Sequence, residues 1–163
     1  AEMYYSLVGR DLEHEILPFA EDVGIGTTVW SPLAGGLLSG RYSREDPTGG
    51  GGRLSSFNFI PVDKDAAFAI IDVLREIGAS RDASPAQVAL AWLLAKRNIS
   101  SVIVGASSAE QFSDNLGALG VNLTADEMAR LDEISAIRLP YPNWFTPVTI
   151  DSAVHQAMEE SGR

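Results

Sequence analysis

Two short segments of strand composition, each followed by a turn rich in small residues, constrain this chain most. Ser101-Val102-Ile103-Val104 is a compact apolar run, typical of a strand buried on both faces of a parallel sheet. Thr27-Thr28-Val29-Trp30 is β-branched and aromatic and also predicts a strand. Helical patterns lie before, between and after these strands. This order of elements predicts an α/β fold with a parallel sheet.

Apolar periodicity and capping signals predict the helices. We expect them at residues 10–23, 63–78, 84–97, 108–116, from 124 onward, and 152–160. Ser84-Pro85-Ala86-Gln87 and Thr124-Ala125-Asp126-Glu127 have the pattern of a capping box, in which the cap and the third helical residue bond reciprocally. The first pattern is amphipathic, and its expected apolar face is formed by Leu12, Ile16, Phe19, Ala20 and Val23. Pro18 falls inside this pattern and is expected to kink or divide that helix.

Composition excludes several classes of function. A formal charge of −10 disfavours sequence-independent binding to nucleic acid or to an anionic membrane surface. The absence of cysteine excludes disulfides and thiolate metal sites, and two histidines are too few for a histidine-rich metal centre, so we predict no metal. With no membrane-length apolar run and no signal-peptide pattern, we expect a cytoplasmic protein.

The strand count is too small for a self-sufficient sheet. Two parallel strands cannot bury their own faces, and 163 residues correspond to about one domain. The chain opens Ala1-Glu2-Met3 without an initiator methionine. We therefore expect a piece of a larger architecture, in which the numbering begins after processing or partway through a longer protein.

The first turn runs from Trp30 to Tyr42 as Trp-Ser-Pro-Leu-Ala-Gly-Gly-Leu-Leu-Ser-Gly-Arg-Tyr. A flat ring at a strand end can stack on a planar heterocycle. The glycines would expose backbone amides to a phosphate, and Arg41 would add a positive charge. The alternative is an ordinary strand-to-loop turn with Trp30 in the core.

The second turn runs from Val104 to Asn115 as Val-Gly-Ala-Ser-Ser-Ala-Glu-Gln-Phe-Ser-Asp-Asn. Its small residues let a ligand approach the backbone, and Ser107 and Ser108 begin a short helix. Gln111, Asp114 and Asn115 share one face of that helix. The alternative is a serine cap on a surface helix. In (β/α)8 barrels, loops after two consecutive strands and a short extra helix often form a phosphate site.

These segments, together with Tyr5-Ser6-Leu7-Val8-Gly9-Arg10 and Ser84 to Leu94, resemble the C-terminal half of the aldo-keto reductases. The similarity is greatest to the branch that includes the potassium-channel β subunits and bacterial relatives, and it covers nearly the whole chain. It implies the C-terminal portion of a (β/α)8 TIM barrel, helix-rich and incomplete in this chain. Residues 1–163 would be a partial domain with a glycine-rich flap at 39–62 and a C-terminal tail at 138–163.

The resemblance also implies which residues bind a cofactor, NADP or alternatively NAD. Trp30 would stack on the nicotinamide. The pyrophosphate would be lined by Ser31, Pro32, Leu33, Ala34 and Gly36, with Arg41 and Arg53. The adenosine end and its 2′-phosphate would be held by Gly105, Ser107, Gln111, Asp114 and Asn115. Many family members have arginine where this chain has Gln111, which weakens the preference for NADPH. The aromatic tail, Tyr141 to Phe145, would lie beside the substrate pocket or would simply pack.

The family's chemistry, the reduction of aldehydes or ketones by hydride transfer, uses a tyrosine acid, a lysine that lowers its pKa, an aspartate and a histidine. The resemblance assigns all four to sequence upstream of Ala1, so we predict no catalytic residue in this chain and no activity from it alone. The alternatives are a non-catalytic nucleotide-binding or interaction module, and a truncated half-barrel that self-associates. A small carbonyl substrate belongs to the complete protein, and we expect self-association or a second chain that supplies the missing half.

Overall fold

The computed structural model describes residues 1–49, 60–149 and 151–160. With η marking a 3-10 helix, the elements in chain order are β1 (Glu2–Tyr4), η1 (Asp11–Glu13), α1 (Ile16–Asp22), β2 (Thr27–Trp30), η2 (Ala34–Ser39), α2 (Lys64–Arg81), α3 (Pro85–Leu94), β3 (Ile99–Val102), α4 (Ala109–Gly117), η4 (Ala118–Gly120), α5 (Ala125–Ile134), α6 (Thr146–Thr149) and α7 (Ser152–Glu160). This helix-rich arrangement around a parallel sheet confirms the predicted α/β class.

The described strands form one parallel sheet in the order β1-β2-β3. Thr28 lies between Glu2 and Ser101 across the sheet, and Tyr4 lies beside Trp30. The sequence predicted two strands, and that count is wrong. β1 has only three residues, one of them a glutamate, which is too short for an alternating pattern to be visible.

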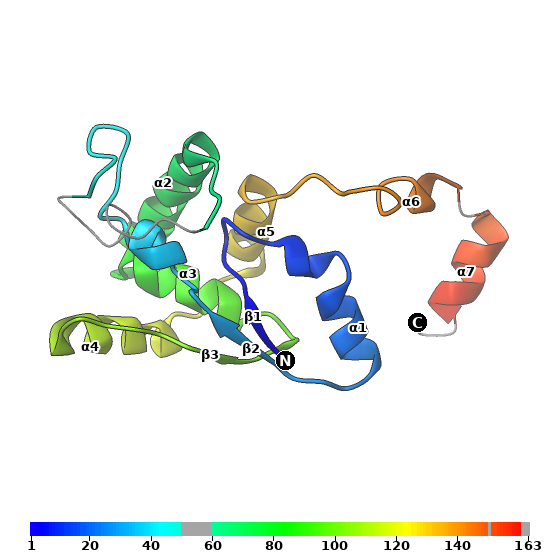
Figure 1. Ribbon diagram of the computed structural model, residues 1–163, viewed down its shortest axis with the longest axis horizontal. Helices are drawn as coiled ribbons and strands as arrows, with labels where there is room; N and C mark the ends of the chain where they lie inside the picture. The colour runs from blue at the N-terminus through cyan, green and yellow to red at the C-terminus, as the bar shows by residue number, and fades with distance from the viewer. Residues whose placement is uncertain (50–59, 150, 161–163) are drawn as a thin grey trace.

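One face of the sheet is covered by helices. Figure 1 shows α2, α3 and α5 together on one side of the strands. Val29 of β2, Leu74 of α2, Trp92 of α3 and Leu131 of α5 are all fully buried where these elements meet. This shared core holds the sheet and α3 in a fixed relative position, and the loops at the strand ends extend from it.

The strand predicted at residues 101–104 begins and ends two residues earlier, and it is not buried on both faces. Ser101 is exposed, and Ile103, just beyond β3, is 45% exposed. The reason is that helices cover only one face, and no described strand pairs with the outer edge of β3. The apolar run therefore predicted a more enclosed strand than the described residues form.

The helix predicted at residues 10–23 is divided. Its pieces are η1 and α1, and Pro18 is the third residue of α1, where a backbone N–H would have no partner within the helix. Leu12 and Ala20 are buried as expected, but Phe19 is 62% exposed. The predicted apolar face is also wrong at Ile16 and Val23, which are exposed because α1 packs mainly against η1.

The remaining helices are confirmed within a few residues, and both capping boxes are present, at Ser84 with Gln87 and at Thr124 with Glu127. The tail passes α1 and carries α6 and α7 away from α2 and α3 (Figure 1). No helix in the described part of the chain is long and apolar enough to cross a lipid bilayer.

Candidate functional site

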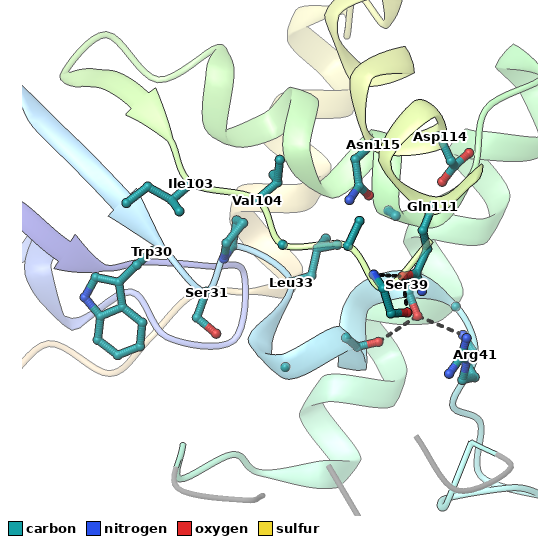
Figure 2. A pocket seen from close by; sticks show the side chains of 18 of the residues that line it. Trp30, Ser31, Leu33, Ser39, Arg41, Ile103, Val104, Gln111, Asp114 and Asn115 are labelled. Carbon is teal, nitrogen blue, oxygen red and sulfur yellow. Dashed lines mark hydrogen bonds between the residues drawn. The ribbon is translucent and has the colours of Figure 1, made fainter. Parts of the chain in front are cut away.

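A groove of about 1070 Å³ lies where the turn after β2 meets the segment between β3 and α4. Its lining comprises Trp30, Ser31, Pro32, Leu33, Gly35, Gly36, Ser39, Gly40, Arg41, Tyr42, Ile60, Ala86, Ile103, Val104, Gly105, Ala106, Ser107, Gln111, Asp114 and Asn115. Figure 2 shows Trp30 at one end and Arg41, Gln111 and Asp114 at the other. Parallel strands explain this convergence, since their carboxyl ends share one edge of the sheet.

Most of the residues predicted to bind a cofactor line this groove. The exceptions are Ala34, which is fully buried beneath the turn, and Arg53, which lies with residues 50–59 outside the described part of the chain. The sequence did not single out Ser39, Gly40, Ile103 and Val104, which also line it. Ser39 and Gly40 lie within the first predicted turn, residues 30–42, but were assigned no role there, while Ile103 and Val104 were assigned to a buried strand.

The turn after β2 holds an unusual run of backbone conformations. Ser31 and Ala34 have φ of 53° and 49°, and Gly35 and Gly36 have φ of 68° and 94°. Left-handed φ at non-glycine residues is strained and concentrates at functional sites. The turn differs from expectation in one respect. The N–H groups of Ala34 and Gly36 donate to the carbonyls of Ser31 and Leu33, at 2.9 Å each, so these amides are used within the turn.

Trp30 lies half-buried on the uncovered face of the sheet. Its ring packs against Tyr4, with centroids 5.2 Å apart and planes at 40°. Gly9 lies so close beneath Tyr4 that a Cβ there would stand 2.3 Å from the ring. The β1 segment thus supports one side of the Trp30 indole.

The segment after β3 supplies the opposite end. Ser108 caps α4 by accepting from the Gln111 N–H, and the N–H and hydroxyl of Ser107 both donate to Gln111 Oε1, at 2.9 and 2.8 Å. Asn115 is 8% exposed, and no hydrogen bond among the described residues engages its side-chain amide. In Figure 2 this amide lies along the groove wall, so Asn115 presents a donor and an acceptor to whatever occupies the groove.

Comparison with known proteins identifies the family. The sequence model of the Aldo/keto reductase family matches residues 1–136. The chain belongs to the aldo/keto reductase family. This confirms the resemblance seen in the sequence, and it associates the chain with a family whose fold is a TIM barrel and whose members generally use nicotinamide cofactors.

Three relatives illustrate how widely the names given to similar proteins differ. "Uncharacterized oxidoreductase YrpG" of Bacillus subtilis is 34% identical, covering 88% of this chain and 41% of the relative. "NADH-specific methylglyoxal reductase" of Escherichia coli is 33% identical, covering 80% and 40%. "Probable voltage-gated potassium channel subunit beta" of Oryza sativa subsp. japonica is 35% identical, covering 72% and 37%. The chain therefore spans about two fifths of the length of the relatives that it matches.

Arg41 is the one basic side chain among the described residues that line this aldo/keto reductase groove, and it is exposed. Its N–H donates to Ser39 Oγ at 3.4 Å, and that hydroxyl donates to the Gly36 carbonyl at 2.7 Å. The guanidinium therefore extends from an ordered turn in a chain of net charge −10, and it is the group best placed to attract a phosphate.

Tyr5 is fully buried and does not line the groove. Its hydroxyl donates to the Glu13 carboxylate, and burial raises the pKa of the Tyr5 phenol, with Glu13 raising it further. A proton donor near neutral pH needs the opposite shift. Lys96 is engaged by other side chains of the fold. Its ammonium donates to Asp132 Oδ1 at 2.7 Å and lies 4.6 Å from the centroid of the Trp92 ring.

The tail and metal predictions concern other parts of the chain. Tyr141, Trp144 and Phe145 pack on one another, and Asn143 Nδ2 donates to the His14 carbonyl at 3.3 Å. None of these rings lines the groove, and each is at least 43% exposed, so the aromatic cluster lies at the surface near His14. Among the described residues, no group of three or more acidic or histidine side chains is arranged to hold a metal ion.

Proposed function

We propose that this chain is the cofactor-binding half of an aldo/keto reductase barrel and that its groove binds NADPH, with NADH as the alternative. The observation that carries the proposal is the convergence of Trp30 and Asn115, from two different strand ends, on one groove of about 1070 Å³. The pattern of loops after two consecutive strands plus a short extra helix supports a position at the C-terminal end of the barrel.

The groove suits a dinucleotide in size and chemistry. Ligand pockets usually measure about 300–1,000 Å³, so this groove has room for a long ligand. An ideal Cβ built at Gly36 or at Gly105 meets nothing within 4 Å, which leaves the backbone open to close approach. Asn115 is 8% exposed and lines the groove, and no hydrogen bond among the described residues engages its side-chain amide, so this amide is available to a ligand.

Each part of the groove has a proposed role. The Trp30 ring would pack flat on the nicotinamide and orient it. The turn from Ser31 to Gly36 would follow the pyrophosphate, with Ala34 shaping the turn from beneath and Arg41 and Arg53 neutralising charge. Gly105, Ser107, Gln111, Asp114 and Asn115 would hold the adenosine, its 2′-phosphate lying near Ser107, Gln111 and Arg41. NADPH is the first choice because the Arg41 guanidinium and the Gln111 side chain lie at that end of the groove.

When bound, the cofactor supplies a hydride to the carbonyl carbon of an aldehyde or ketone, which also takes up a proton to become an alcohol. In this chain, Trp30 would fix the face of the nicotinamide from which transfer occurs. By the family resemblance, the proton donor would lie outside residues 1–163; within them, the pKa of Tyr5 is shifted upward and Lys96 is held by Asp132, so neither supplies the proton. We therefore expect binding without turnover from this chain alone.

A second candidate function is a nucleotide-binding or interaction module without catalysis. The similarity to a protein named as a potassium-channel β subunit supports it, and so do the surfaces that the fold leaves open. No described strand pairs with the outer edges of β1 and β3, and Phe112, Leu116 and Leu119 form an exposed stripe along α4 and η4. Such edges and apolar surface favour association with a second copy or with a chain that completes the barrel.

Titration of tryptophan fluorescence tests the binding proposal. NADPH should quench the emission saturably, and Trp30→Phe should remove most of the quenching. The matched control is Trp144→Phe, which should leave the quenching intact. Trp144 lies in the tail outside the groove lining and is 52% exposed. A folded sample that shows no saturable quenching would overturn the proposal. The decrease in NADPH absorbance after addition of a simple aldehyde then tests turnover. Light scattering measures whether the chain associates with itself.

A further inference from the structure

Ser84 and Gln87 form the capping box at the start of α3, and they also make hydrogen bonds to α4. Helix α4 supplies Gln111, Asp114 and Asn115 to the lining of the groove. Within the box, Ser84 Oγ accepts from the Gln87 N–H at 3.2 Å, and the Ser84 N–H donates to Gln87 Oε1 at 3.1 Å. These bonds satisfy two donors at the helix start and orient both side chains. The remaining donors, the Ser84 hydroxyl and the Gln87 NH2, therefore face away from α3.

Both remaining donors reach Asp114. The Ser84 hydroxyl donates to Asp114 Oδ2 at 2.8 Å, and Gln87 Nε2 donates to Asp114 Oδ1 at 3.0 Å and to the Asp114 carbonyl at 2.9 Å. Gly117, one turn further along α4, makes this contact possible. A Cβ at that position would stand 2.3 Å from Gln87 Nε2.

We infer that Ser84 and Gln87 are positioning residues for the proposed cofactor groove: by holding Asp114 they set the register of α4, and with it the position of Asn115 at the adenosine end. The inference rests on the proposed function. Asn115 follows Asp114 directly and is 8% exposed, and no hydrogen bond among the described residues engages its side-chain amide. A rotation or slide of α4 by a fraction of a turn would withdraw its amide from the groove.

A second capping box in the chain, at the start of α5, provides a control for the role of Ser84 and Gln87. The Thr124 and Glu127 capping box of α5 also reaches a second helix, through Arg81 of α2. Neither residue lines the groove, nor does Arg81. Disrupting that box should weaken helix packing as disrupting the Ser84 box does, but it should not move α4.

The decisive variant is Gln87→Glu, which keeps the acceptor for the Ser84 N–H but sets a second carboxylate against Asp114. The double variant with Asp114→Asn returns a donor to the pair, with the amide and the carboxylate exchanged, and completes a double-mutant cycle. Binding of three probes is measured by calorimetry on the full chain: NADPH, 2′,5′-ADP for the adenosine end, and nicotinamide mononucleotide for the Trp30 end.

We expect Gln87→Glu to weaken NADPH and 2′,5′-ADP by about tenfold, the effect of one lost charge-assisted contact, and to leave nicotinamide mononucleotide unchanged. The double variant should regain at least about threefold, and the Glu127→Gln control should bind all three probes as the wild type does. Unchanged 2′,5′-ADP binding in Gln87→Glu, equal loss of both half-probes, or no recovery in the double variant would overturn the inference alone. Failure of the wild-type chain to bind NADPH and NADH would overturn the proposed function and the inference with it.

Discussion

Arg81 and Glu127 join the end of α2 to the start of α5 through a two-pronged ion pair, with Nε and Nη2 donating to the two carboxylate oxygens at 2.7 and 2.5 Å. Glu127 also accepts from the Thr124 N–H at 2.7 Å. The hydrogen bonds from Arg81 lower the pKa of the Glu127 carboxyl to about 2, and those from Thr124 contribute. The Glu127 side chain thus completes the capping box of α5 and also connects α5 to α2.

This pair should make stability depend on pH. Because the folded-state pKa of Glu127 is depressed, its contribution is present above the ordinary glutamate value and is lost as the pH falls toward about 2. Glu127→Gln should lower the free energy of unfolding at pH 7 by about 1 kcal/mol. Urea unfolding of both proteins at a series of pH values should show this difference shrinking below about pH 4. A difference that stays constant with pH would contradict the assignment.

Gly117→Ala should destabilise the chain, because its Cβ would stand 2.3 Å from Gln87 Nε2 and would force that side chain away from Asp114. We expect a loss of about 1–3 kcal/mol, as for other overpacked sites. Gly120→Ala is the matched control, since nothing lies within 4 Å of its Cβ and its φ is not in the left-handed region. Thermal unfolding of the two variants should separate them clearly; equal midpoints would disprove the close approach.

Gly105→Val should weaken dinucleotide binding without weakening the fold. Gly105 lines the groove and is exposed, an ideal Cβ there meets nothing within 4 Å, and its φ is not in the left-handed region, so a small side chain is expected to cost the unliganded fold little. Calorimetry should show NADPH affinity lowered by about tenfold or more, while the free energy of unfolding changes by less than about 0.5 kcal/mol. Normal affinity in this variant would mean that the ligand does not approach the backbone at Gly105.

Arg41→Ala should reduce NADPH affinity in a salt-dependent way. An exposed charge acting on a phosphate contributes at most about 1 kcal/mol, so the expected loss is about threefold to fivefold at low ionic strength. The loss should shrink at about 1 M salt, where the Debye length falls to about 3 Å. Arg97→Ala removes the same charge outside the groove lining and should not change the affinity. If both variants lose affinity equally, net charge rather than Arg41 is responsible.

Local signals predicted the helices and the groove, while features that depend on packing between elements were missed. Ser84 and Thr124 revealed their helices because a capping box is written in four adjacent residues. The turns after Trp30 and Val104 predicted one groove because parallel strands end at the same edge of the sheet. The bonds from Gln87 to Asp114 span 27 residues, so no local pattern indicates them. Phe19 was assigned to a core because periodicity cannot tell whether a partner surface is present.

The central claim is that one dinucleotide contacts Trp30 and Asn115 together, and a heteronuclear NMR titration of the isotope-labelled chain tests it most directly. The indole N–H of Trp30 and the side-chain NH2 of Asn115 give separate signals, assignable with Trp30→Phe and Asn115→Asp. As NADPH is added, both signals should shift with one dissociation constant. Shifts at only one of the two residues, or at both with different constants, would contradict the account.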